Sequence, residues 1–284
     1  MKTFWTGTCL SVLLLLSACG EAPETPPSST DAAPPAAVPT DTAPGQTGEL
    51  ALDSFDRIEV DVLAADIRLT TGDSWSLSYD LSEKEPLEQL GVVGSTLYVE
   101  TRFDPLERPD LIGGWHVTIT VPEGTALSDV ELSSIAGEVS VQDLTCDEVS
   151  LGSTAGSITA QQLQAREAEA ESISGNLSLL AIQADSLEAE STSGKLELEG
   201  TFGELETSTV SGSTAITAAI TGSAEIESVS GGIGLTLTAP ASIQASSVGG
   251  VTLNGDKQGR SLTTSGGVPV EIESVSGKIA IETP

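Results

Sequence analysis

A short pattern of polar and apolar positions recurs through the second half of the chain. It consists of a hydroxyl residue, two further residues, a glycine, and apolar residues two and four positions after the glycine. Alternation with period two indicates β-strands, and such a repeat, sustained over many copies, is typical of a solenoid. The glycines are 17 to 19 residues apart, with a last interval of 11, and are Gly137, Gly156, Gly175, Gly194, Gly212, Gly231, Gly249, Gly266 and Gly277.

A second alternating stretch precedes each glycine, with apolar residues seven and five positions before it, as in Val149 and Leu151. The pattern therefore predicts an all-β fold, a single-stranded β-helix or solenoid with coils of about 19 residues. Coils about 4.8 Å apart would stack small aliphatic side chains into ladders, which agrees with an aromatic content of only 3%. Each glycine would supply a positive φ or room for close backbone approach.

Residues 49–126 show a looser form of the same alternation. Strands are expected around residues 58–62, 65–69, 76–81, 96–100 and 116–122, with Ala65 at a corner where the later coils have glycine. An open solenoid end has to be covered. We therefore expect a β-rich capping part over residues 49–126 and regular solenoid repeats over 127–284.

The order of these segments carries a family resemblance. Ala65-Asp66-Ile67-Arg68-Leu69, Trp75-Ser76-Leu77-Ser78-Tyr79, Val117-Thr118-Ile119-Thr120-Val121-Pro122 and then repeated Ser-x-Ser-Gly phrases follow one another. Over about residues 50–284 the chain resembles a bacterial family of β-strand-repeat domains classed as "putative adhesins", of unknown function. The resemblance implies a β-helical fold in secreted or membrane-anchored proteins, and it supplies no catalytic residues to carry over.

The N-terminus has the features of a targeting segment. Lys2 precedes the apolar run Leu10–Leu16, which is too short to span a bilayer as a helix. Leu16-Ser17-Ala18-Cys19 resembles the lipobox of bacterial lipoproteins. The resemblance implies that residues 1–18 are a signal peptide, that cleavage precedes Cys19, and that Cys19 carries diacylglycerol and acyl chains such as palmitate. An ordinary signal peptide cleaved near Ala18 is the alternative.

Residues 19–48 are expected to be a tether. They hold seven of the 14 prolines among Ala, Thr, Ser and acidic residues, so they bury too little apolar surface to fold. Gly20 stands where Asp would resemble an inner-membrane retention signal, so the outer membrane is the favoured location within a bacterial cell envelope.

The charge of the chain excludes some functions. With 42 acidic and 11 basic residues, the formal net charge is −31, which disfavours binding to nucleic acid. One His and three Cys leave little for a zinc site or a disulfide scaffold. Cys146, next to Asp147, is expected to be structural, since nearby acid makes a thiol a poor nucleophile. We expect no catalytic, cofactor-binding or metal-ligating residues, and no cofactor.

Hydroxyl residues stand three positions before each glycine. A catalytic serine needs a neighbouring base and is normally unique, whereas these are repeated, and the only histidine, His116, lies outside the repeat. We therefore expect a ladder of hydroxyls that bond neighbouring coils or corner backbone groups. Its predicted members are Ser134, Ser153, Ser172, Ser191, Thr209, Ser228, Ser246, Thr263 and Ser274.

Glutamates occupy outward positions of the strand before the glycine. If coils are in register, Glu131, Glu169, Glu188, Glu206 and Glu225 form one row, and Glu171, Glu190 and Glu227 a second. One interpretation is a face that weakly binds divalent cations or a polycation. The other is solubility and protection of a β-surface against association, or adaptation to salt. The Gly-Gly-x-Gly-x-Asp calcium repeat is absent.

These features favour a lipid-anchored, non-enzymatic, adhesin-like binding or structural module whose partner is an unknown surface glycan or protein. Two alternatives stay open. One is an envelope-stress or signalling accessory that faces the periplasm. The other is a polysaccharide-acting β-helix enzyme, which would need a non-repeated cluster of acids with Arg or Lys. An ice-binding array is disfavoured because the outward positions next to the glycines are mixed.

Overall fold

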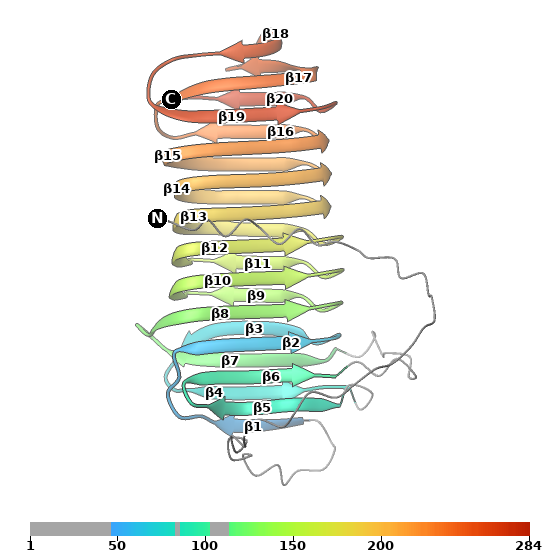
Figure 1. Ribbon diagram of the computed structural model, residues 1–284, viewed down its shortest axis with the longest axis vertical. Coiled ribbons are helices and arrows are strands. Elements are labelled where there is room, and N and C mark those ends of the chain that lie inside the picture. The colour runs from blue at the N-terminus through green and yellow to red at the C-terminus, as the bar shows by residue number, and fades with distance from the viewer. Residues whose placement is uncertain (1–46, 83–85, 103–113) are drawn as a thin grey trace, which may run out of the picture. The chain divides into compact units, whose positions relative to one another are not determined.

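The computed structural model describes residues 47–82, 86–102 and 114–284. The predicted signal peptide, Cys19 and most of the tether lie outside these ranges. The described part is all-β, as predicted, and its strands join into one continuous hydrogen-bonded sheet that turns back on itself coil by coil (Figure 1). The described residues include no helix long and apolar enough to cross a membrane.

Each coil contributes one strand to each of two opposed sheet faces. In stacking order, the first face consists of β5 (Leu87–Val93), β6 (Thr96–Thr101), β2 (Arg57–Val62), β8 (Ala126–Ser134), β10 (Thr145–Ser153), β12 (Gln164–Ser172), the later parts of β13 (Leu177–Ser193), β14 (Leu196–Ser211) and β15 (Thr214–Ser230), β19 (Val268–Ser274), β17 (Ala241–Leu253) and β18 (Asp256–Thr263).

The second face uses the remaining strands. In the same direction, it consists of β1 (Thr47–Ala51), β4 (Ser76–Asp80), β7 (His116–Pro122), β3 (Asp66–Gly72), β9 (Val139–Gln142), β11 (Ile158–Gln161), the first parts of β13, β14 and β15, β16 (Ile233–Leu237), β20 (Ile279–Glu282) and the end of β17. Most pairs are parallel. The antiparallel pairs involve β1, β4, β5 and β18, at the two ends of the stack.

The stacking order departs from the chain order at both ends. The coil of β2 and β3 lies between the β6/β7 coil and the β8/β9 coil, and the coil of β19 and β20 lies between β15/β16 and β17 (Figure 1). The prediction that Gly266 is a corner glycine is therefore wrong. Val268 and Val270 belong to β19 on the first face, where Val270 pairs with Ala224.

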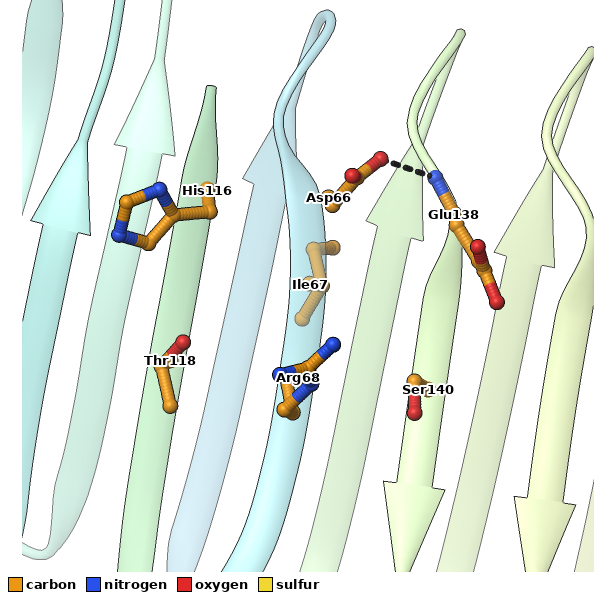
Figure 2. A pocket seen from close by; sticks show the side chains of 7 residues that line it. All are labelled: Asp66, Ile67, Arg68, His116, Thr118, Glu138 and Ser140. Atoms are coloured by element: carbon orange, nitrogen blue, oxygen red, sulfur yellow. Dashed lines mark hydrogen bonds between the residues drawn. The ribbon is translucent and has the colours of Figure 1, made fainter. Parts of the chain in front are cut away.

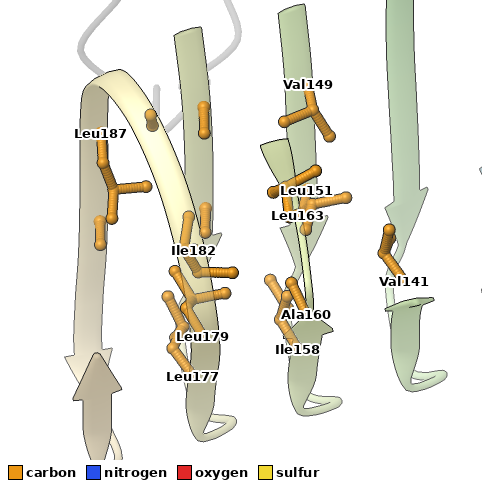
Figure 3. Packing of buried hydrophobic residues seen from close by; sticks show 14 of the residues in the cluster. Val141, Val149, Leu151, Ile158, Ala160, Leu163, Leu177, Leu179, Ile182 and Leu187 are labelled. Carbon is orange, nitrogen blue, oxygen red and sulfur yellow. The ribbon is translucent and has the colours of Figure 1, made fainter. Parts of the chain in front are cut away.

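The core is a set of aliphatic ladders between the two faces. Residues at the predicted inward positions are buried in every regular coil, among them Val149, Leu151, Ile158 and Leu177 (Figure 3). Val149 pairs with Ala168, and Ala168 pairs with Leu187, 19 residues further each time. Where β13 meets β14, the register shifts between Leu179 and Ile182, and the partners beyond the shift are 18 residues apart.

The corner glycines form a column of close backbone contacts. A Cβ added to Gly156 would lie 1.9 Å from the carbonyl oxygen of Gly137, and one added to Gly175 would lie 1.8 Å from that of Gly156. The same relation holds up the stack. It links Gly194 to Gly175, Gly212 to Gly194, Gly231 to Gly212, Gly277 to Gly231 and Gly249 to Gly277. Of the two roles predicted for these glycines, close approach therefore applies along the whole column.

The hydroxyl ladder forms beside this column. Ser153 Oγ donates to the Gly137 carbonyl at 3.2 Å and accepts from the Gly156 N–H at 2.9 Å, and Ser134 makes the equivalent pair of bonds. Ser134, Ser153 and Ser172 tie consecutive coils together, as predicted.

Further along the stack the prediction is wrong for Ser191 and Ser228, whose buried hydroxyls have no hydrogen-bond partner in the described part of the chain. Thr209 bonds Thr214 and the Glu227 carbonyl. Ser247, not the predicted Ser246, takes the place in the coil of Gly249, and it bonds the Gly277 carbonyl and the Gly249 N–H. Thr263 is also not in the ladder, because it lies exposed on β18.

Candidate functional site

Outward-facing carboxylates gather on the first sheet face. The register places Glu169 beside Glu188, and the row continues along the stack through Glu206 and Glu225. The first predicted row is therefore confirmed, although Ser150 lies between Glu131 and Glu169. We call this surface the acidic face. Its first row also includes two residues that sequence reasoning missed, Glu59 beside Glu131 and Glu271 beside Glu225.

A second row runs parallel to the first. Glu171 pairs with Glu190, and Glu227 pairs with Glu273, while Ser208 separates these two pairs. Glu271 and Glu273 stand six and four positions before Gly277, so the repeat contained the signal for both. Among the residues that the structure describes, ion pairs such as Arg57–Asp129 at 3.3 Å include no member of either row. Within the described ranges, the carboxylates of these two rows thus lack a side-chain cation.

Burial and mutual repulsion raise the pKa of several of these groups. Partial burial, a hydrogen bond with Glu171 and repulsion from Glu171, Glu188 and Glu190 raise the pKa of Glu169 to about 7. Burial followed by repulsion from row neighbours also raises the pKa of Glu188, Glu190 and Glu206 above the ordinary value of 4.5. Near neutral pH the acidic face therefore resists full ionisation, and a bound cation would favour the charged form.

We expect the free energy of unfolding to increase on mild acidification. The pKa of Glu169 is about 7 in the folded chain and near 4.5 when unfolded, so the folded state binds more protons between these values. Stability should rise as the pH falls through 7 and level off below 4.5. Glu169→Gln should stabilise the protein at pH 8 by about 0.2–1 kcal/mol, since it removes like charges that lie directly opposite each other. Urea titrations at pH 8 and 5.5 measure both effects.

The control for this experiment is Glu123→Gln, in the exposed turn after β7 and away from both rows. It should leave the pH dependence unchanged. A wild-type protein that is more stable at pH 8 than at pH 5.5 would contradict the electrostatic account of the acidic face.

A shallow groove lies on the acidic face. Its volume is about 400 Å³, and its lining includes Glu188, Glu206, Glu225 and Glu271 together with Glu204. The carboxylates come from successive strands and are therefore spread along the stack. In the described part of the chain, no three Asp, Glu, His or Cys residues converge to hold a metal ion. The arrangement suits an extended cationic ligand better than a single coordinated ion.

A second polar hollow lies on the opposite face, near the N-terminal end of the domain. It has a volume of about 360 Å³ and is lined by side chains of β7, β3 and β9 and by the corner before β9 (Figure 2). Arg68 lies at its centre, between Thr118 and Ser140. The Asp66 carboxylate accepts a hydrogen bond from the Glu138 N–H at 2.8 Å. Sequence reasoning missed this hollow because its strands are distant in the chain.

His116 and Ser140 of the hollow do not form a catalytic serine–histidine pair. His116 and Ser140 lie on β7 and β9, which are separated by the whole of β3. Two strand spacings amount to roughly 9–10 Å, well beyond the reach of a base that activates a hydroxyl. Cys146 is no alternative nucleophile, because burial and nearby Asp147 and Asp129 raise its pKa to about 12. Asp66 and Glu138 line the hollow together with Arg68, so it does hold a non-repeated pair of acids with an arginine.

The comparisons with known proteins identify the family. The chain belongs to the Toastrack DUF4097 family, whose profile matches residues 55–282. This result confirms the predicted membership of a family of β-strand-repeat domains of unknown function. No protein of curated function matches the sequence.

Several solved structures are similar to this chain. A "putative adhesin" from Bacteroides fragilis NCTC 9343 has 16% identity and a TM-score of 0.47, with 84% of this chain and 96% of that chain covered. A "putative lipid binding protein" from Parabacteroides distasonis ATCC 8503 has 14% identity and a TM-score of 0.45, with coverages of 84% and 96%. A "putative adhesin" from Parabacteroides merdae ATCC 43184 has 14% identity and a TM-score of 0.41, with coverages of 84% and 97%.

Proposed function

We propose that the protein is a non-enzymatic, adhesin-like binding module of the bacterial cell envelope, and that the acidic face is the surface it presents to a partner. The observation that carries this proposal is the pair of in-register carboxylate rows, which form no ion pair with any Lys or Arg that the structure describes. Like charges directly opposite each other destabilise a sheet. A partner that supplies positive charge would remove this cost, so binding and folding would support each other.

The partner in this proposal is a surface glycan or protein. Divalent cations would bind the acidic face weakly, because the carboxylates are spread along the stack and do not form a compact ligand set. Such ions could still bridge the face to an anionic glycan, since Ca²⁺ accepts oxygen ligands from both sides.

We further propose that the module is anchored by lipid at Cys19. The sequence Leu16-Ser17-Ala18-Cys19 supports cleavage before the cysteine, and Gly20 supports transfer to the outer membrane. Each acyl chain contributes about 0.8 kcal/mol per buried CH₂. The proline-rich residues 19–48 would then act as a spacer between the membrane and the folded domain.

Metabolic labelling with palmitate tests the anchor. Cys19→Ala should abolish the label, because it removes the cysteine that the lipobox presents for acylation. Cys146→Ala is the matched control and should keep the palmitate label, since Cys146 is buried in the core. Label that persists in Cys19→Ala, or an unlabelled wild-type protein, would contradict lipidation at Cys19.

Protease treatment of intact and lysed cells tests the proposed role. Digestion of the domain on intact cells is expected for a surface module, whereas protection until lysis would favour the periplasm-facing accessory. Purified protein should also bind isolated envelope material, and E188Q/E206Q/E225Q/E271Q should bind at least tenfold more weakly. Equal binding by the two proteins would overturn the acidic face as the contact surface.

A further inference from the structure

A line of β-branched side chains follows one corner of the stack. They stand two positions before the corner glycine, or one before it in the coil of Gly249, and we call them the corner ridge. The ridge contains six of the eight exposed large hydrophobic residues in the described part of the chain, with exposures of 40–64%. In stacking order, its members are Ile135, Thr154, Ile173, Thr192, Val210, Val229, Val275 and Val248.

Folding does not require the apolar character of the ridge. Its side chains point outward, and the inward neighbours Ser172, Thr209 and Ser228 are the buried ones. Thr154 and Thr192 occupy the same position in two coils, so a β-branched polar residue fits this backbone equally well. A long apolar line with polar surroundings is typical of an interaction site.

The most continuous stretch of the ridge borders the acidic face. Val210, Val229, Val275 and Val248 follow one another without a threonine, and Val248 and Val275 are each 64% exposed. A groove of about 300 Å³ next to them is lined by Val229 and Val275 on one side and by Glu227 and Glu273 from the second carboxylate row. Apolar and anionic groups thus lie together in one surface feature.

The spacing of the stretch favours a helical ligand. Coils repeat about every 4.8 Å, while one turn of an α-helix rises 5.4 Å. In an extended strand, side chains on one side recur only about every 6.6–6.8 Å. Over four coils, a helix laid along the ridge can therefore place one apolar residue near each valine, and a strand cannot.

Charge distinguishes three possible occupants of the ridge: an anionic membrane surface, a second copy of the chain and a basic partner. The carboxylates beside the ridge would repel an anionic membrane surface, and a second copy would bring its own acidic rows against them. A basic partner would be attracted. We propose that this stretch docks an amphipathic, positively charged helix, whose apolar side chains cover the four valines and whose Lys or Arg residues face Glu227 and Glu273. This inference rests on the proposed binding function and names the chemistry of one partner.

The test is a titration of the full chain, purified in detergent, with a fluorescent 18-residue Leu/Lys peptide that has all leucines on one helical face. A scrambled peptide of the same composition should bind at least tenfold more weakly. V210T/V229T/V275T/V248T keeps β-branching and nearly the same shape, and it should weaken binding at least tenfold. Val93→Thr, on exposed Val93 of β5, is the matched control and should bind as wild type does.

Charge substitutions distinguish helix docking at the ridge from the broader proposal that the acidic face is a contact surface. E227Q/E273Q should weaken binding and reduce its dependence on salt. If the glutamine variants lose affinity while the threonine variant keeps it, the ridge is not the docking surface, but the acidic face remains a contact surface. Equal binding of both peptides would also overturn the ridge. If the fourfold variant has a lower melting temperature than wild type, Val275→Thr alone serves as the test, with a two- to threefold loss expected.

Discussion

Replacement of Gly175 by Ala should lower the free energy of unfolding by about 3 kcal/mol or more, at the upper end of the range for overpacking. The added Cβ would lie 1.8 Å from the carbonyl oxygen of Gly156 and 2.5 Å from its carbon. Both are backbone atoms, so no side chain can rotate away. The coils would have to move apart at this corner, which would stretch the hydrogen bond from Ser172 to the Gly156 carbonyl in the preceding coil.

Gly152→Ala is the matched control for this experiment. Gly152 lies in β10, and the nearest atom to an added Cβ is Ser133 Oγ at 3.7 Å, an ordinary contact. Because Ala in a strand interior costs less backbone entropy than Gly, this variant should gain up to about 0.5–1 kcal/mol. Urea unfolding followed by circular dichroism measures both changes. Similar small effects at the two positions would show that the glycine column is not required for close stacking.

The repeat predicted the coil because the physical demands of stacking are local and identical in every layer. An inward aliphatic residue such as Leu151 needs its counterpart one coil away, and the corner glycine needs the carbonyl beneath it. A hydroxyl such as Ser153 can satisfy both a neighbouring carbonyl and its own corner N–H. These requirements leave a readable period in the sequence, and they fix which residues point inward.

Because every coil has the same stacking requirements, the sequence pattern does not reveal the order in which the coils stack. Any coil with matching ladders can stack on any other, so the pattern does not say that β19 and β20 insert between β15/β16 and β17. The interval of 11 residues between Gly266 and Gly277 was a signal, because it is too short for a complete coil. The replacement of Ser246 by Ser247 in the ladder follows from the same irregular end, where the corner glycine comes two residues after the hydroxyl.

The candidate surfaces also differ in how far the sequence predicts them. The acidic rows could be predicted because Glu188, Glu206 and Glu225 repeat in phase with the glycines. The hollow around Arg68 could not be, since it depends on β3 lying between β7 and β9, which only the stacking order reveals. The corner ridge had a repeating sequence signal at Ile173, Val210 and Val229. Its exposure, however, depends on how the corner is turned, and alternation alone does not give that orientation.

Phe202→Ala should cost about 3–5 kcal/mol, the range for removing a buried aromatic side chain. Phe202 is fully buried and heads the large buried side chains of the protein. It stacks between Ala184 and Ile220, so its ring fills the space that a small neighbour leaves. Gly200 helps to make this room, because a Cβ there would lie 2.9 Å from the tip of the ring. Phe202→Leu, the control, should cost less than about 1.5 kcal/mol if the coil repacks.

The position of Phe202 gives this variant a second, more specific signature. The stability of a solenoid is carried from one coil to the next, so a defect in β14 separates the coils before it from those after it. Trp75 and Trp115 report on the N-terminal coils, whereas circular dichroism reports on the whole sheet. We expect the two urea transitions to coincide in wild type and to separate in Phe202→Ala. Coincident transitions in the variant would show that a defect in one coil does not uncouple the unfolding of the coils before and after it. If they separate, Glu188 on β13 and Glu225 on β15, the strands on the two sides of β14, lose their fixed register. Binding through the acidic face should then weaken in parallel.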